Sequence, residues 1–204
     1  MLSNKTKIAV LVSGGGTILQ ALLDASDRNE IVDGEICLVV SNNPNAYALE
    51  RAKKHGVKAV CIDKTVYKTI EEREAKTIEV LEENGIELIV LAGYLSILSE
   101  NFTKRYQNRI INVHPSLIPS FCGKGFYGLK VHEEALKYGV KVTGATVHFV
   151  NEIPDGGKIN MQKAVYIEDG DTAEILQKRV MQQAEWIILP MSVQMVAKKL
   201  RENK

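Results

Sequence analysis

The chain lacks any long apolar run, any excess of charge of one sign and any dense set of cysteines. No stretch approaches the roughly 20 apolar residues that a membrane-spanning helix needs, so the sequence predicts none. The 26 Lys and Arg against 25 Asp and Glu give a formal net charge of +1, which argues against a nucleic-acid or membrane-surface partner. The first residues show no signal-peptide pattern, and a cytoplasmic location is expected.

The three cysteines are odd in number and far apart, so no disulfide framework is predicted. Cys37 and Cys61 fall in apolar strand-like runs and are expected to be small core residues. Cys122 lies in a glycine-rich segment and is expected to be exposed. The histidines show no metal-ligand spacing with these cysteines, so no metal site is predicted.

The 204 residues are predicted to form one α/β domain. Apolar runs alternate with helical patterns over the first two-thirds of the chain, which indicates a mostly parallel, Rossmann-like sheet with helices on both faces. Strand order is not readable from this pattern. The expected strands are 7–12, 35–40, 57–62, 86–91 and 109–113, and the expected helices are 17–27, 46–55, 70–84 and 95–106.

The last third of the chain has a different pattern, with an antiparallel strand and a long final helix expected. Residues 120–128 contain three glycines and are interpreted as a mobile loop. The remaining expected elements are a helix over 129–138, a half-buried alternating strand over 143–150, a strand over 159–167 and a helix over 172–199 that breaks or kinks near Pro190.

The run from Asn112 to Pro119 places an amide and an imidazole at the end of a predicted buried strand. Asn112 and His114 are two residues apart, so their side chains leave the same face of the strand, and Pro115 then ends regular pairing. A neutral donor and a proton source aimed at one point can hold a reacting carbonyl oxygen. The alternative is a strand-end turn with a hydrogen-bonded histidine.

Three consecutive glycines, Gly14 to Gly16, follow the first predicted strand, and Thr17 opens the next helix. A helix N-terminus behind glycines predicts an anion site. A dinucleotide fingerprint requires glycine where Leu19 stands, and an ATP loop requires a Gly-Lys-Ser/Thr sequence that is absent. A small phosphate monoester is therefore favoured, and the alternative is a tight turn without a ligand.

Asp155 lies in a Pro-Asp-Gly-Gly segment, where Asp is also a common turn residue. A functional role requires this carboxylate to fold back near His114. It would then stabilise the imidazolium and raise the pKa of the histidine. The sequence alone does not place the two residues together.

Five segments together resemble the glycinamide ribonucleotide transformylase family, also called phosphoribosylglycinamide formyltransferase. The resemblance covers essentially the whole chain, and the Asn-x-His-Pro-Ser-Leu-x-Pro run is specific to folate-dependent formyl transfer. The segments are 13–17, 91–94, 112–119, 144–150 and 155–157, the last together with Gln162.

The resemblance implies transfer of a formyl group from 10-formyltetrahydrofolate, a co-substrate, to the amine of glycinamide ribonucleotide in de novo purine synthesis. It implies direct attack by the amine, with the oxyanion stabilised by Asn112 and by His114 as imidazolium. It also implies a single domain with a phosphate-binding half (1–113) and a folate and catalytic-loop half (114–204). The expected partners are these small molecules, with the chain as a monomer or homodimer.

The family's functional positions can be matched to this sequence one by one. They are Asn112, His114 and Asp155 for catalysis; Gly15, Gly16, Thr17 and Ile18 for the substrate phosphate; Arg73, Leu95, Ser96, Ile97, Leu98 and Asn112 for folate; and Glu185, near a family acidic residue that meets the substrate.

The chain departs from the family pattern at three of its positions. Ile18 replaces a usual Asn, so phosphate binding would rely on backbone N–H groups and Thr17. Ser96 stands where Arg is often found, which leaves the pterin to the backbone, and Lys158 stands where Pro is common. Arg73, on a charged helix, has the alternative of being a solvated surface residue.

Three other functions share parts of this pattern. Formyltetrahydrofolate hydrolase uses the same machinery with water as acceptor, but it has an extra N-terminal domain, which is not expected here because the first predicted strand begins at about Lys7. Methionyl-tRNA formyltransferase has an extra C-terminal domain that is not expected here. A non-catalytic protein that binds a phosphate ligand remains open because of Ile18.

Overall fold

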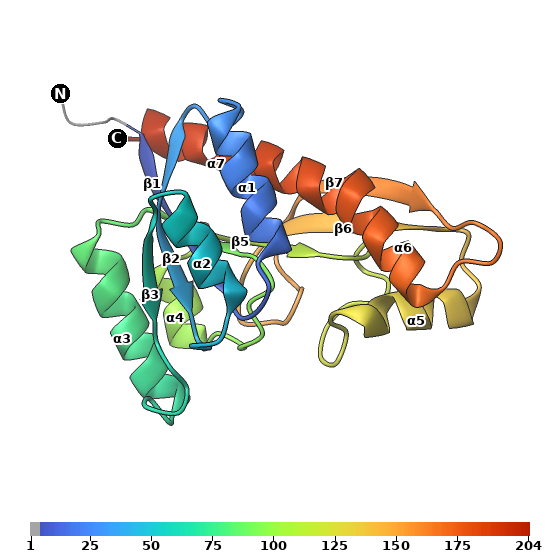
Figure 1. The fold of residues 1–204 in the computed structure, drawn as a ribbon, viewed down its shortest axis with the longest axis horizontal. Helices are drawn as coiled ribbons and strands as arrows, with labels where there is room; N and C mark the ends of the chain where they lie inside the picture. The colour runs from blue at the N-terminus through green and yellow to red at the C-terminus, as the bar shows by residue number, and fades with distance from the viewer. Residues whose placement is uncertain (1–4) are drawn as a thin grey trace.

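The computed structural model describes residues 5–204 as one seven-stranded sheet with helices on both faces (Figure 1). Part of the N-terminal segment assessed for a signal peptide, residues 1–4, lies outside the described residues. The strand order is β3-β2-β1-β4-β5-β6-β7. The strands are β1 (Thr6–Val12), β2 (Gly34–Ser41), β3 (Lys58–Cys61), β4 (Leu88–Leu91), β5 (Ile110–His114), β6 (Val142–Phe149) and β7 (Ile159–Tyr166).

The first five strands of this order are parallel to one another, from β3 at the edge to β5. Strand β6 pairs antiparallel with β5, and β7 pairs antiparallel with β6. The prediction of a mostly parallel sheet is therefore confirmed, with a second antiparallel pairing added. The helices are α1 (Thr17–Asp27), α2 (Tyr47–Lys54), α3 (Ile70–Glu83), α4 (Glu100–Arg105), α5 (Leu129–Tyr138), α6 (Ala173–Val180), the π-helical turn η1 (Met181–Glu185) and α7 (Trp186–Glu202).

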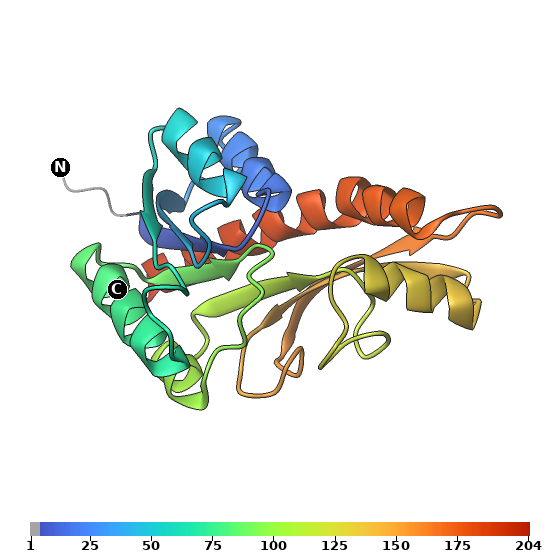
Figure 2. The same cartoon turned by 60° about the horizontal axis from the view of Figure 1, so that its bottom comes forward.

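Two apolar cores lie on opposite faces of the sheet. Ile8 and Val10 of β1 face a core with α1, α2, α6 and α7, whereas Ala9 and Leu11 face a core with α3 and α4. The second view shows α3 and α4 on the other side of the sheet from α1 and α7 (Figure 2). Burial of successive residues on both faces explains why these strands are continuous apolar runs.

Strand β6 is buried on both faces, so the prediction of a half-buried strand is wrong. The segment after β5 covers its second face. The Thr146 hydroxyl donates to the Ser116 carbonyl at 2.7 Å and accepts from the Ile118 N–H at 3.1 Å. The Ile118–Pro119 peptide bond in this covering segment is cis.

The predicted helix over 95–106 is confirmed only in its second half. Helix α4 begins at Glu100 because the Ser99 hydroxyl caps it, accepting from the Phe102 N–H at 3.2 Å. Cys61 is exposed, so its prediction as a core residue is wrong, because β3 is the edge strand. Cys37 and Cys122 are partly buried, and all three thiols are free.

The break in the C-terminal helix lies at η1, before the predicted position at Pro190. Pro190 is buried inside α7. A proline cannot donate to the carbonyl four residues earlier, which here belongs to Trp186, and the π-helical turn ends directly before that residue. Within residues 5–204, no helix combines the length and apolar character needed to cross a membrane.

Candidate active site

A cleft of about 750 Å³ opens at the carboxyl ends of the central parallel strands. Thr17 and Ile18 line it after β1, and the segment from Leu91 to Leu98 lines it after β4. Strand order reverses between β1 and β4, and ligands of open α/β sheets bind at such a switch point.

The structure brings the three predicted catalytic residues into this cleft. Asn112 and His114 end β5, and Asp155 approaches from the loop between β6 and β7. Asp155 Oδ2 lies 3.5 Å from His114 Nδ1 and accepts the Gly123 N–H at 2.8 Å. The proximity that the sequence left open is therefore present, and the catalytic role of the three residues remains a prediction.

His148 is a fourth member of this cluster that the sequence did not identify as functional. It lies opposite Asn112 in the β5–β6 register. Its Nε2 is 3.2 Å from Asn112 Nδ2 and 3.5 Å from Asp155 Oδ1, and its Nδ1 is 2.9 Å from the Phe149 carbonyl. Nδ1 therefore donates to that carbonyl, which leaves Nε2 to accept from the Asn112 amide. The alternating pattern of residues 143–150 places His148 on one face of a strand, and this is the sequence signal that could have indicated its role.

Burial has a larger effect on the pKa of His114 than the neighbouring carboxylate of Asp155 has. It lowers the pKa of His114, and the carboxylate of Asp155 opposes this without reversing it. The expected effect of Asp155, which raises the pKa of His114, is therefore confirmed, but burial outweighs it and the net shift is downward. The pKa of Asp155 is lowered: its burial acts in the opposite sense but is outweighed by His148, His114 and the Gly123 N–H. Burial thus favours the neutral form of His114, but its contacts suit the protonated form, since Nε2–H donates to the Phe121 carbonyl at 2.8 Å and Nδ1 faces the ionised carboxylate of Asp155.

The glycine loop is held closely against α2. Gly16 has φ of 73°, and a β-carbon there would lie 2.7 Å from Ala48 Cβ, so only glycine fits. The Ala48 N–H donates to the Gly14 carbonyl at 3.1 Å, and Arg51 Nε donates to the Gly15 carbonyl at 2.8 Å. Thr17 and Ile18, which begin α1, line the cleft, whereas Gly15 and Gly16 are not among its lining residues.

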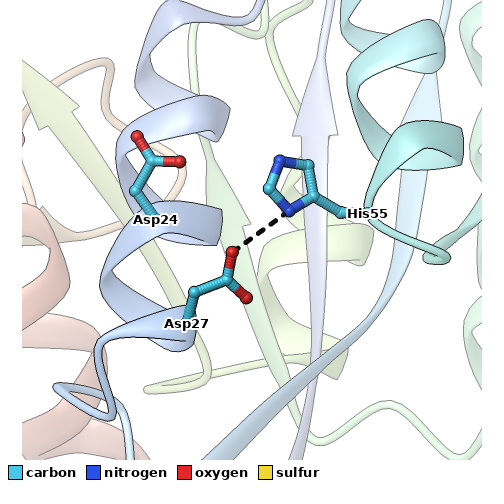
Figure 3. A group of neighbouring side chains, drawn as sticks. All are labelled: Asp24, Asp27 and His55. Atoms are coloured by element: carbon cyan, nitrogen blue, oxygen red, sulfur yellow. Dashed lines mark ion pairs between the residues drawn. The ribbon is translucent and has the colours of Figure 1, made fainter.

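A polar network behind this loop extends to His55. Arg51 Nη1 donates to Gln20 Oε1 at 2.9 Å, and Gln20 Nε2 lies 2.8 Å from Asp24 Oδ1 and 2.9 Å from His55 Nε2. Figure 3 shows His55 and Asp27 facing each other, with 3.4 Å between Nδ1 and Oδ2. Asp24, Asp27 and His55 are close enough to share a metal ion. However, donation by Gln20 leaves the His55 proton on Nδ1, toward Asp27, so the group fits a hydrogen-bond network better.

The segment predicted to hold folate gives an apolar wall to the cleft. Leu95, Ser96, Ile97 and Leu98 all line it, and Leu95 and Ile97 are 69% and 62% exposed. The Leu95 N–H donates to the Ser13 hydroxyl at 3.0 Å, which fixes the wall to β1. Arg73 does not line the cleft, since its guanidinium donates to the carbonyls of residues 67 and 68.

Glu185, predicted to meet the substrate, also lines the cleft. It is 4% exposed, and its carboxyl group forms no hydrogen bond or ion pair with any residue from 5 to 204. Burial raises the pKa of Glu185 to about 7. A carboxyl group near its pKa can donate or accept, which suits a hydroxyl ligand.

Comparison with known proteins identifies the family to which this chain belongs. Residues 6–192 match the family model described as formyl transferase. A phosphoribosylglycinamide formyltransferase of Haemophilus influenzae is 40% identical over 92% of this chain and 85% of its own length. The trifunctional purine biosynthetic protein adenosine-3 of Gallus gallus is 44% identical over 96% of this chain, which spans only 19% of that protein.

Solved structures agree with this result. Glycinamide ribonucleotide transformylase 1 of Symbiobacterium toebii has a TM-score of 0.89 and 38% identity, over 97% of this chain and 90% of that one. The fold is an α/β sheet of Rossmann-like architecture with a cleft at its switch point. Within this fold class, the chain belongs to the formyl transferase family.

Proposed function

We propose that this protein transfers the formyl group of 10-formyltetrahydrofolate to the amine of glycinamide ribonucleotide, a step of purine synthesis. One observation carries the proposal. A single cleft joins a phosphate-type loop, an apolar wall for a ring system and the polar cluster around His114. The two ligands would meet at this cluster, so that the amine and the formyl carbon lie in contact.

In the proposed reaction the amine attacks the formyl carbon, and the carbonyl oxygen becomes an oxyanion. One amide hydrogen of Asn112 is used by His148, and the second is left for this oxygen. His114 Nε2–H would exchange its Phe121 carbonyl partner for the same oxygen. His114 donates through this hydrogen, and both the developing negative charge and the carboxylate of Asp155 favour its protonated form.

The transfer also moves one proton, because the attacking nitrogen loses a proton and the departing folate nitrogen gains one. Asp155 is ionised and lies beside His114, so it would accept the proton through water and return it. The reaction as proposed needs no covalent bond to the protein and no metal ion.

The ligand-binding roles follow the positions of the residues in the cleft. Thr17 and Ile18 line the cleft, and together with Gly15 and Gly16, which precede them, they would hold the phosphate through the backbone, since Ile18 has no side-chain donor. The segment 95–98 would hold the folate ring. Glu185 would meet a sugar hydroxyl. Residues from both 1–113 and 114–204 line the cleft, so both halves would contribute to each ligand.

An assay of folate release with and without glycinamide ribonucleotide tests this function. We expect release only when the amine substrate is present. Equal release without it would indicate a hydrolase and overturn the proposal. A matched control is the same substrate without its phosphate, which should bind more weakly if the glycine loop holds the phosphate.

A further inference from the structure

His132 on α5 is a buried histidine for which the proposed reaction gives no role. It is 0% exposed, yet it is one of the residues that line the cleft. Neither of its ring nitrogens has a hydrogen-bond partner within residues 5–204. Buried polar groups are nearly always paired, so two unpaired nitrogens in one ring point to a partner that binds from the cleft.

The packing of α5 does not require an imidazole at this position. The other buried residues of this helix are Val131 and Ala135, so its inner face is apolar. An apolar side chain of similar size would avoid burying two unpaired polar atoms, which reduces stability. The imidazole therefore carries a cost in the protein without ligands.

The protonation of His132 limits the kind of partner. Burial, with a smaller contribution from His114, lowers the pKa of His132 to about 4, so the ring is neutral at physiological pH. A neutral imidazole has one N–H donor and one acceptor nitrogen. A phosphate or carboxylate could pair only with the N–H, and an ammonium only with the acceptor nitrogen. A hydroxyl group can pair with either nitrogen, because it both donates and accepts.

We propose that His132 is a binding residue of the cleft that holds a hydroxyl oxygen beside His114. The hydroxyl comes from the sugar of the substrate or from an ordered water molecule. This inference rests on the proposed function for the identity of the sugar. It makes α5 part of the binding site and gives His132 a role separate from the oxyanion contacts of Asn112 and His114.

Substitution by Leu separates this role from a structural one. We expect His132→Leu to unfold at the same or a higher temperature, because it removes two unpaired polar atoms, and to lose at least tenfold in kcat/KM. His132→Asn places an amide near the position of Nδ1, and His132→Gln near that of Nε2. Recovery by one of them identifies the nitrogen that binds. Normal turnover by the Leu variant would overturn the proposal.

A substrate without one sugar hydroxyl distinguishes the two sources. If the sugar supplies the hydroxyl, the deoxy substrate is poorer with the wild-type protein but not with His132→Leu, and the loss falls on KM. If water supplies it, the deoxy substrate has the same relative effect in both proteins, and the Leu substitution lowers kcat. Both results support the proposal, whereas kinetic losses that follow the unfolding temperature in every variant contradict it.

A measurement without turnover separates this inference from the proposed function. The ¹⁵N signals of the His132 ring, assigned by their loss in His132→Leu, should shift when glycinamide ribonucleotide is added without folate. Lys137→Gln, at an exposed position of α5 outside the cleft lining, is the control and should leave the shift unchanged. An unshifted His132 signal in a protein that forms the formylated product would exclude the sugar as the source of the hydroxyl, and together with a normal kcat in His132→Leu it would overturn this inference alone. Absence of formyl transfer by the wild-type protein would overturn the proposed function instead.

Discussion

At the scale of single residues, the protonation of His114 depends on burial, which lowers its pKa, and on Asp155, which raises it. In Asp155→Asn the opposing charge is lost at nearly constant shape, so the pKa of His114 should fall further. Because the proposed reaction uses both groups, kcat should fall by about 10²–10⁴-fold. An NMR titration of His114 and steady-state kinetics measure the two effects, and a rise in the His114 pKa would contradict this account.

His148 should act by holding the Asn112 amide in position. In His148→Ala the acceptor for Asn112 Nδ2 is lost, and we expect kcat to fall by up to about 10²-fold, with KM little changed. His148→Gln supplies an amide oxygen as a new acceptor and should recover part of the rate. A normal kcat in the Ala variant would show that Asn112 needs no such support.

Glu185 makes stability depend on pH. Its folded-state pKa of about 7 lies above the unfolded value of 4.5, so between these values the folded chain holds a proton that the unfolded chain has lost. Stability therefore falls as pH rises through this range, by about 3 kcal/mol in total. We expect Glu185→Gln to be more stable than wild type at pH 8 by about that amount and equal at pH 4, as measured by urea unfolding. An equal difference in stability between the two proteins at both pH values would show that Glu185 does not cause this pH dependence.

At the scale of elements, Gly16 joins β1 to α1 in a geometry that excludes a β-carbon. Gly16→Ala must adopt φ of 73° and approach Ala48, so we expect a loss of about 1–2 kcal/mol in stability from the backbone alone. KM for the phosphorylated substrate should rise while folate affinity is retained. Gly14→Ala is the control, because no heavy atom lies within 4 Å of its β-carbon position. Equal effects of both substitutions would contradict the role of Gly16.

The sequence predicted elements well where periodicity and burial agree. The helices over 17–27 and 129–138 were predicted to the residue, because each presents an apolar stripe and begins or ends at glycine. The segment 95–98 is not helical because Leu95 and Ile97 face the cleft and only Leu98 packs in the core. A proline within a helical pattern predicts a break, and the sequence therefore predicts it near Pro190. The π-helical turn that lies before it has no recognisable sequence pattern.

At the scale of the whole molecule, the site depends on the antiparallel strands β6 and β7. Pairing of β6 with β5 sets His148 opposite Asn112, and the loop after β6 returns Asp155 to His114. The sequence supplied the residue types and the strand face of the Asn112–His114 pair. It could not supply the strand order, and therefore could not show that His132, His148 and Asp155 reach the same cleft.

The most direct test of the central claim uses 10-formyltetrahydrofolate labelled in its formyl carbon, with mass spectrometry of the products. With glycinamide ribonucleotide present, the account predicts labelled N-formyl product from the wild-type protein and none above background from His114→Ala, which should still bind folate. Labelled formate in place of the formylated amine, or equal product from the His114→Ala variant, would contradict the account.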